Sequence, residues 1–194
     1  IKVYLRTYGC RANHYDTEAV RPILARSGPI ATADIADADA AIFTTCTVTA
    51  AAEADLRADV RAASRVNPSL RTVVMGCAAG LPTRDERVAP LRELPSVHAI
   101  VPGADLSGIS DALGLDLSFA ALSQTETQTG ARALLRIQDG CDEHCTFCAT
   151  TLSRGSSRSR SVDEIVQEAT ILSASHPEIV LTGIHIVSYG TDVG

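Results

Sequence analysis

The sequence predicts an α/β fold in which helices cover a parallel β-sheet. Short apolar stretches, several of them alternating with polar residues at a period of two, are separated by longer stretches with apolar residues at helical spacing. This alternation is typical of βαβ units, whose strands run parallel. The chain has 194 residues, of which 45% are hydrophobic, so it is long enough for one fair-sized domain or two small ones.

Strands and helices are expected to alternate along a first domain at residues 1–115. The strands are predicted by short apolar runs at residues 2–7, 40–45, 71–75 and 97–101. The helices are predicted by apolar residues at helical spacing at residues 15–26, 50–66, 84–94 and 105–113. Ser27-Gly28-Pro29 stops the first helix and Asn67-Pro68 stops the second. We expect these elements to form three layers, with the sheet in the middle.

A linker is predicted at residues 116–130, where the sequence is polar and shows no period. After it we expect strands at residues 133–138 and 178–182, and between them a helix at residues 162–173 with acidic residues in its first turn. Two strands and one helix bury too little apolar surface for a core of their own. Residues 131–194 are therefore expected to be the start of a second α/β domain that is truncated.

The charge of the chain limits its possible partners. A net charge of −6 argues against a surface that is built as a whole to bind nucleic acid. Residues 149–161, however, contain Arg154, Arg158 and Arg160 and no acid, which is typical of a solvated loop or of a local anion-binding segment. No run of about 18 apolar residues occurs, and the first residues are too few and too charged for a secretory signal. We expect a cytoplasmic protein without a membrane partner.

The cysteines are the strongest indication of chemistry. There are six, namely Cys10, Cys46, Cys77, Cys141, Cys145 and Cys148. Cytoplasmic α/β proteins rarely keep disulfides, so metal binding or catalysis is favoured. The last three form a Cys-x3-Cys-x2-Cys motif, and each of the first three comes directly after a predicted strand. Because parallel strands end at the same edge of a sheet, we expect the first three thiols to converge.

Two sets of three thiolates suit two iron–sulfur clusters, each with one iron that has no protein ligand and can hold a substrate. A structural zinc site would need a fourth ligand, for which only His14 or His144 is close in the sequence. Gly9 and Gly76 each precede a cysteine and would let the backbone approach a bulky group.

Two polar residues follow Cys10 by about one helical turn. Asn13 and Asp16 are expected either to cap a helix that begins near Tyr15 or to orient a bound cluster, and capping is the favoured interpretation.

Four segments carry a resemblance to a known family. Residues 141–148, Cys-Asp-Glu-His-Cys-Thr-Phe-Cys, resemble the cluster loop of the radical S-adenosylmethionine superfamily. Residues 7–18, Thr-Tyr-Gly-Cys-Arg-Ala-Asn-His-Tyr-Asp-Thr-Glu, together with residues 45–49 and 76–77, resemble the extra N-terminal domain of the methylthiotransferases. The resemblance implies that residues 131–194 are the first part of a partial (β/α) radical S-adenosylmethionine barrel.

Three branches of the methylthiotransferase family compete. They act on threonylcarbamoyladenosine in tRNA, on isopentenyladenosine in tRNA, and on an aspartate of a ribosomal protein. Residues 154–160 and 178–190 resemble the first branch, which implies methylthiolation at C2 of threonylcarbamoyladenosine. The implied partners are tRNA and an electron donor, and neither DNA nor a membrane.

The resemblance also implies cofactors and roles. It implies two [4Fe-4S] clusters and S-adenosyl-L-methionine, with Cys141, Cys145 and Cys148 holding the cluster that binds this cofactor. Cys10, Cys46 and Cys77 would hold the cluster that carries the inserted sulfur. The cofactor would lie against Phe147, Thr182 and Gly183. Candidate substrate contacts are Arg154, Arg158 and Arg160, for phosphate or carboxylate groups, and His185 and Tyr189, for the base.

Two alternatives stay open from the sequence. One is methylthiolation of isopentenyladenosine, and the other, from a different class, is a non-catalytic iron–sulfur or zinc module that binds RNA or senses redox state. We expect the chain alone to be inactive, because half of the implied barrel is not in the sequence.

Overall fold

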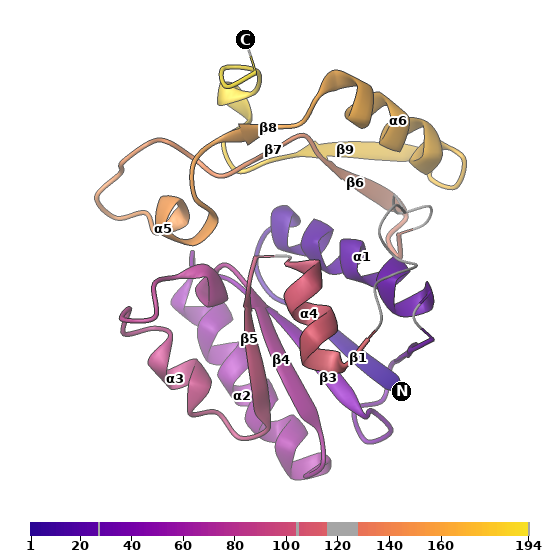
Figure 1. Ribbon diagram of the computed structural model, residues 1–194, viewed down its shortest axis with the longest axis vertical. Helices are drawn as coiled ribbons and strands as arrows, with labels where there is room; N and C mark the ends of the chain where they lie inside the picture. The colour runs from indigo at the N-terminus through magenta and orange to yellow at the C-terminus, as the bar shows by residue number, and fades with distance from the viewer. Residues whose placement is uncertain (27, 104, 116–127, 194) are drawn as a thin grey trace.

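The first part of the chain forms a five-stranded parallel sheet with strand order β2-β1-β3-β4-β5 (Figure 1). The computed structural model describes residues 1–26, 28–103, 105–115 and 128–193. The strands are β1 (Lys2–Thr7), β2 (Ile30–Thr32), β3 (Ala40–Thr45), β4 (Arg71–Gly76) and β5 (Val97–Pro102). All residues of the central strand β3 are buried, because helices cover both faces of the sheet. The predicted α/β fold with a parallel sheet is confirmed.

Helices form the two outer layers of this part. They are α1 (Arg11–Arg26), α2 (Ala50–Val66), α3 (Ala89–Arg92) and α4 (Leu106–Leu113), with a short 3-10 helix η1 (Ala78–Gly80) after β4. α1 and α4 pack on the face of the sheet that carries Val3, Ile42 and Met75. α2 and α3 pack on the other face, around Phe43 and Val74. The three predicted layers are therefore present (Figure 1).

Three elements differ from the prediction. α1 begins at Arg11, four residues before the predicted start at residue 15. The helix predicted at residues 84–94 is reduced to the four residues of α3, because Pro90 lacks the N–H that would bond to an earlier turn and Pro95 disfavours helix in the residue before it. The edge strand β2 was not predicted, since its three residues are too few to show a period.

The second part has a two-stranded parallel sheet of β6 (Arg132–Arg136) and β9 (Glu178–Thr182), covered by α6 (Val162–Ser173). Its small core consists of Ala133, Leu135, Ile137 and Leu172. Ser161 and Glu164 form a capping box at the start of α6, so the helix begins where the sequence predicted.

The segment between β6 and α6 carries short elements. They are β7 (Gln138–Asp139), α5 (Thr150–Arg154) and β8 (Arg158–Ser159), and a 3-10 helix η2 (Ile186–Ser188) follows β9. The predicted strand at residues 133–138 is thus divided between β6 and β7. β7 pairs antiparallel with β8, which turns the chain back after the second set of cysteines.

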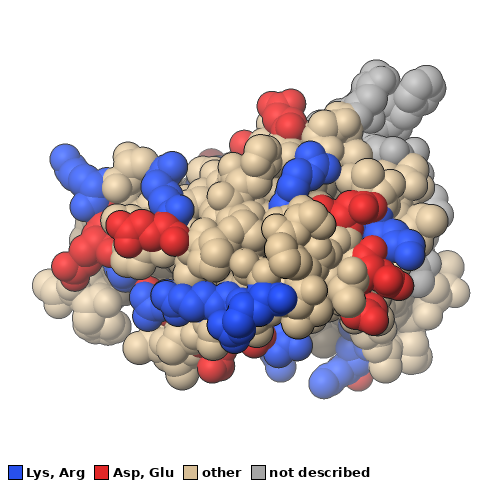
Figure 2. Space-filling view, turned by 90° about the horizontal axis from the view of Figure 1, so that it is seen from below, with Lys and Arg blue, Asp and Glu red and all other residues tan. Residues whose placement is uncertain are grey.

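The sheet of β6 and β9 lies across the carboxyl edge of the large sheet, next to α1 (Figure 1). Residues 116–127 of the predicted linker lie outside the described residues, and the division into domains stays a prediction. At the opposite end of the molecule, basic and acidic side chains are interspersed around one row of basic groups (Figure 2). Among the described residues, no helix is both long and apolar enough to cross a membrane.

Candidate functional site

The first three cysteines lie at one edge of the large sheet. β1, β3 and β4 are neighbours, and Cys10, Cys46 and Cys77 come shortly after them in the chain. Because the three strands are parallel, all three cysteines share the carboxyl edge. Cys46 and Cys77 are buried, whereas Cys10 is exposed.

Two glycines at this edge have backbones that other residues rarely adopt. Gly9 has a φ of 99°, and a Cβ there would lie 2.6 Å from the Cβ of Cys46. Gly76 also has a φ of 99°, and a Cβ there would lie 2.7 Å from the backbone oxygen of Thr45. Both glycines are therefore required by the close approach of neighbouring strand ends, whether or not a bulky group is bound.

Asn13 joins the strand ends to one another. Its Nδ2 donates to the backbone oxygens of Tyr8 at 2.8 Å and Thr45 at 2.6 Å, and its Oδ1 accepts from the Sγ of Cys77 at 3.3 Å. Because α1 begins before them, Asn13 and Asp16 lie inside the helix and do not cap it. The capping interpretation is therefore wrong, and both side chains point into the space between the two parts of the chain.

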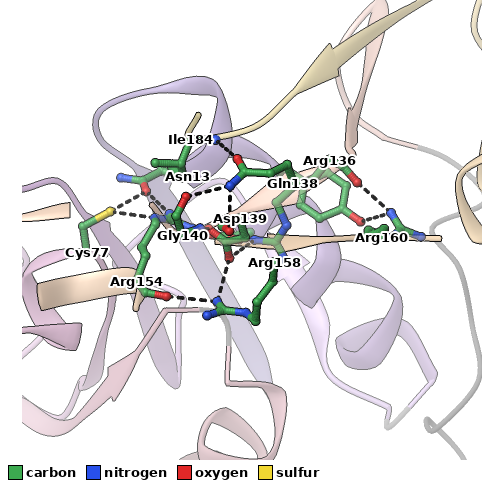
Figure 3. A network of polar contacts seen from close by, with 12 residues as sticks. Asn13, Cys77, Arg136, Gln138, Asp139, Gly140, Arg154, Arg158, Arg160 and Ile184 are labelled. Carbon is green, nitrogen blue, oxygen red and sulfur yellow. Dashed lines mark hydrogen bonds and ion pairs between the residues drawn. The ribbon is translucent and has the colours of Figure 1, made fainter. Parts of the chain in front are cut away.

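Arg154, at the end of α5, reaches this edge from the second part of the chain (Figure 3). Its side chain is only 3% exposed, and its Nη2 donates to Asp16 at 2.7 Å and to Asn13 at 2.8 Å. Its Nε lies 3.2 Å from the Sγ of Cys77, and its Nη1 lies 3.1 Å from Asp139. Two carboxylates, an amide and a thiol thus surround one buried guanidinium.

This guanidinium belongs to a larger buried network. Asp16 also forms an ion pair with Arg136, and Arg136 lies 3.3 Å from Asp139. Burial raises the pKa of the Cys77 thiol, and the neighbouring Arg154 acts in the opposite direction. Since a buried charge is costly unless it is paired, each member of the network depends on the others.

The second set of cysteines lies in the loop between β7 and α5. Cys141 is half-buried, and Cys145 and Cys148 are exposed. Hydrogen bonds with the hydroxyl and backbone of Thr150 lower the pKa of Cys148. A lowered pKa favours the thiolate, which is the form that binds metals.

The comparisons with known proteins decide the family. Residues 2–96 match the family described as "Uncharacterized protein family UPF0004". The chain is 32% identical over 209 residues to the threonylcarbamoyladenosine tRNA methylthiotransferase MtaB of Bacillus subtilis, and 31% identical over 196 residues to MtaB of Rickettsia prowazekii. These alignments cover 98% and 96% of this chain. The chain belongs to the methylthiotransferase family.

The methylthiotransferase relatives carry two different names. Besides the MtaB proteins, the chain is 31% identical over 205 residues to the tRNA-2-methylthio-N(6)-dimethylallyladenosine synthase of Christiangramia forsetii, an alignment that covers 97% of this chain. The chain spans 45%, 44% and 42% of the length of these three relatives. The comparisons therefore establish the family and leave the branch to experiment.

The cysteines of this chain have the donor atoms that iron–sulfur clusters need. All six cysteines are free, and soft thiolates are the ligands that such clusters take. Within the described ranges, however, no group of three or more His, Cys, Asp or Glu side chains is arranged to hold a metal ion. The two sets of cysteines thus provide the right donor atoms, and their assignment to two clusters stays a prediction.

The three arginines that were predicted to contact substrate have different surroundings. Arg154 is buried, whereas Arg158 is 57% exposed and lies 3.7 Å from Asp139. Arg160 forms an ion pair with the buried Glu168. Arg154, Arg158 and Asp139 help to line an open pocket between the two parts of the chain. Among the three, Arg158 is the most accessible cation.

The residues predicted to contact the cofactor or the base lie on loops around β7 and the end of β9. Phe147 is 91% exposed, and Thr182 is buried at the end of β9. A Cβ at Gly183 would lie 3.1 Å from the backbone oxygen of Gln138. His185 is half-buried on the loop after β9.

Tyr189 has a structural contact of its own. Its hydroxyl donates to the backbone oxygen of Arg160 at 3.0 Å, and its ring packs against the small core of the second part. The predicted contacts of Tyr189 and His185 with the base stay predictions.

Sequence reasoning missed Gln138, which organises the second set of loops. Gln138 is fully buried, its Nε2 donates to the backbone oxygen of Gly140 at 2.7 Å, and its Oε1 accepts from the amides of Ile184 and His185. It also missed Arg136 and Asp139. The available signal was the presence of polar and charged residues at the end of an apolar strand directly before a cysteine motif, since buried polar groups need partners.

The surroundings of Tyr15 predict that the free energy of unfolding depends on pH. It lies on α1, and its hydroxyl donates to Glu168 of α6 at 3.2 Å. Burial, together with the charge of Glu168, raises the pKa of Tyr15 from 10.0 to about 12. Between these values the unfolded chain loses the proton and the folded chain keeps it, so stability falls as pH rises above 10.

We expect the variant Tyr15→Phe to lose less stability than the wild type between pH 10 and 11, by up to about 1.4 kcal/mol per pH unit. Urea unfolding at pH 8, 9, 10 and 11 measures this difference. The variant Tyr4→Phe is the control, because it removes a different tyrosine hydroxyl of the same chain. Equal pH dependence in Tyr15→Phe and the wild type would contradict the expectation.

Proposed function

We propose that this chain is the cysteine-bearing part of an enzyme that adds a methylthio group to C2 of threonylcarbamoyladenosine in tRNA. The observation that carries the proposal is that three cysteines follow three adjacent parallel strands, while the Cys-x3-Cys-x2-Cys loop is joined to the same edge by Arg154. Two MtaB relatives, each more than 30% identical, support the threonylcarbamoyladenosine branch. The dimethylallyladenosine (isopentenyladenosine) branch is the second candidate, favoured by the relative from Christiangramia forsetii.

Each set of cysteines has a separate role in this proposal. Cys141, Cys145 and Cys148 hold one [4Fe-4S] cluster in the exposed loop, and Cys10, Cys46 and Cys77 hold the other at the sheet edge. When bound, the clusters and S-adenosyl-L-methionine supply the radical that activates the adenine carbon and the sulfur that is inserted. An external electron donor completes the requirements, and a cytoplasmic location fits a tRNA substrate.

The side chains around the pocket bind and orient in this proposal. The exposed Arg158 at the rim of the pocket contacts an anionic group of the tRNA, either a phosphate or the carboxylate of the threonylcarbamoyl group. Phe147, which is 91% exposed beside two cysteines, covers the adenine of the cofactor and excludes water from it. Thr182 and Gly183 border the methionine part of the cofactor at the end of β9.

The test uses the complete gene product, since the chain spans less than half the length of its relatives. The protein is purified without oxygen, reconstituted with iron and sulfide, and incubated with S-adenosyl-L-methionine, a reductant and one of three tRNA pools. One pool carries threonylcarbamoyladenosine, one carries dimethylallyladenosine, and one carries neither. Mass spectrometry of the nucleosides is expected to show a methylthio product from the first pool only.

The other outcomes of this test have defined meanings. A product from the second pool only would assign the protein to the dimethylallyladenosine branch. If no 5'-deoxyadenosine is formed with any of the three pools, the radical chemistry is refuted. A non-catalytic iron–sulfur or zinc module that binds RNA is then favoured instead.

A further inference from the structure

Among the described residues, the polar contacts that join the two parts of the chain are concentrated around α1. Glu18 accepts from the backbone amide and the hydroxyl of Thr129, and Tyr15 contacts Glu168. These contacts lie toward β6 and α6, away from the cysteine loop. Among the described contacts, Arg154, at the end of the helix α5 that follows the cysteine loop, is the side chain that reaches the carboxyl edge of the large sheet.

The position of Arg154 couples it directly to both sets of cysteines. On one side, its guanidinium contacts Cys77 and also Asn13, which itself contacts Cys77. On the other side, Gly155, the next residue, accepts at its backbone oxygen from the amide of Cys141 at 3.0 Å. A displacement of Arg154 therefore moves the cysteine loop relative to the sheet edge.

The backbones are also in close contact at this point. A Cβ on Gly80 of η1 would lie 2.2 Å from the backbone oxygen of Ser153, so any larger residue would force α5 away from the sheet edge. The backbones of η1 and α5 thus pack closely against each other, and Arg154 adds directional hydrogen bonds across this contact.

The chemistry of the site requires arginine. The acceptors around the guanidinium come from α1, β7 and the end of β4, and they are contacted by Nε, Nη1 and Nη2 separately. A planar guanidinium has five donors in a fixed fork, which matches acceptors on several sides. A lysine ammonium is a single point charge and cannot reach all of these acceptors at once.

We propose that Arg154 is a positioning residue that holds the Cys141–Cys148 loop at a fixed separation from Cys10, Cys46 and Cys77. The functional importance of this separation rests on the proposed function, in which the sulfur carried at one site must reach the carbon activated at the other. Its positioning role is a property of the chain alone, and it is tested both without and with clusters.

The first test measures hydrogen exchange on the complete gene product without iron. The variant Arg154→Met is expected to raise exchange in η1 and α5 at least tenfold, and Arg154→Lys is expected to give an intermediate rise. Arg132→Met is the matched control, because Arg132 forms an exposed ion pair with Glu178 in the same part of the chain. Unchanged exchange in η1 and α5 for Arg154→Met would overturn the proposal.

The second test uses the reconstituted complete gene product and electron paramagnetic resonance. In the wild type and Arg132→Met, the two reduced clusters are expected to show a magnetic interaction, which depends on their separation. In Arg154→Met we expect a weaker interaction at an unchanged iron content, a result that a general loss of stability does not produce. An unchanged interaction in Arg154→Met would overturn the proposal. Protein that takes up no iron would refute the proposed function, and the hydrogen-exchange result would then decide the positioning role by itself.

Discussion

Replacing Cys141, Cys145 and Cys148 together with alanine is expected to abolish cleavage of S-adenosyl-L-methionine and to remove about four irons per chain. Under the proposed function, these thiols are the protein ligands of the cluster that binds the cofactor. The fold should survive the change, because Cys145 and Cys148 are exposed and Cys141 is half-buried. Exposed substitutions of this kind usually change stability by less than about 0.5 kcal/mol each.

Iron analysis and chromatography of 5'-deoxyadenosine on the reconstituted complete gene product measure this effect. The matched control is the triple alanine variant of Cys10, Cys46 and Cys77, which should still form 5'-deoxyadenosine but yield no methylthio product. This control should also be less stable, because Cys46 and Cys77 are buried and alanine leaves space. Continued cofactor cleavage by the first variant would show that other residues hold the cofactor.

The elements of the large sheet were predictable because each one has a clear local signal. β3 begins with four apolar residues, and α2 ends at Val66, directly before the predicted stop at Asn67-Pro68. The errors arise where local signals compete. The start of α1 was placed too late because Asn13 and Asp16 look like capping residues, while their side chains are used for long-range contacts instead.

The candidate site was predictable to the extent that it follows from topology. Strand ends and cysteine positions can be read from the chain, and parallel strands bring Cys10, Cys46 and Cys77 to one edge. The role of Arg154 could not be inferred, because the sequence around it is typical of a solvated loop. Its burial depends on Asp16, which is 138 residues away and has no sequence signal that links it to α5.

Replacing Asp16 with alanine is expected to lower the free energy of unfolding by about 3–5 kcal/mol. Asp16 is fully buried and pairs with both Arg136 and Arg154. Removing the carboxylate leaves Asp139 as the remaining acidic partner of both guanidinium groups, and an incompletely paired charge is costly in a buried site. Urea unfolding followed by circular dichroism measures the change.

Glu178→Ala is the control for this prediction, because Glu178 and Arg132 form an exposed ion pair and such pairs contribute about 0–1 kcal/mol. If Asp16→Ala does not fold, Asp16→Asn provides the measurement, since it keeps the shape of the side chain and removes only its charge. In the double variant Asp16→Asn with Arg154→Met, the loss should be smaller than the sum of the two single losses, because one unpaired charge has been removed. A strictly additive loss would mean that Asp16 and Arg154 are not energetically coupled, and Arg154 would then not join the two parts of the chain through Asp16.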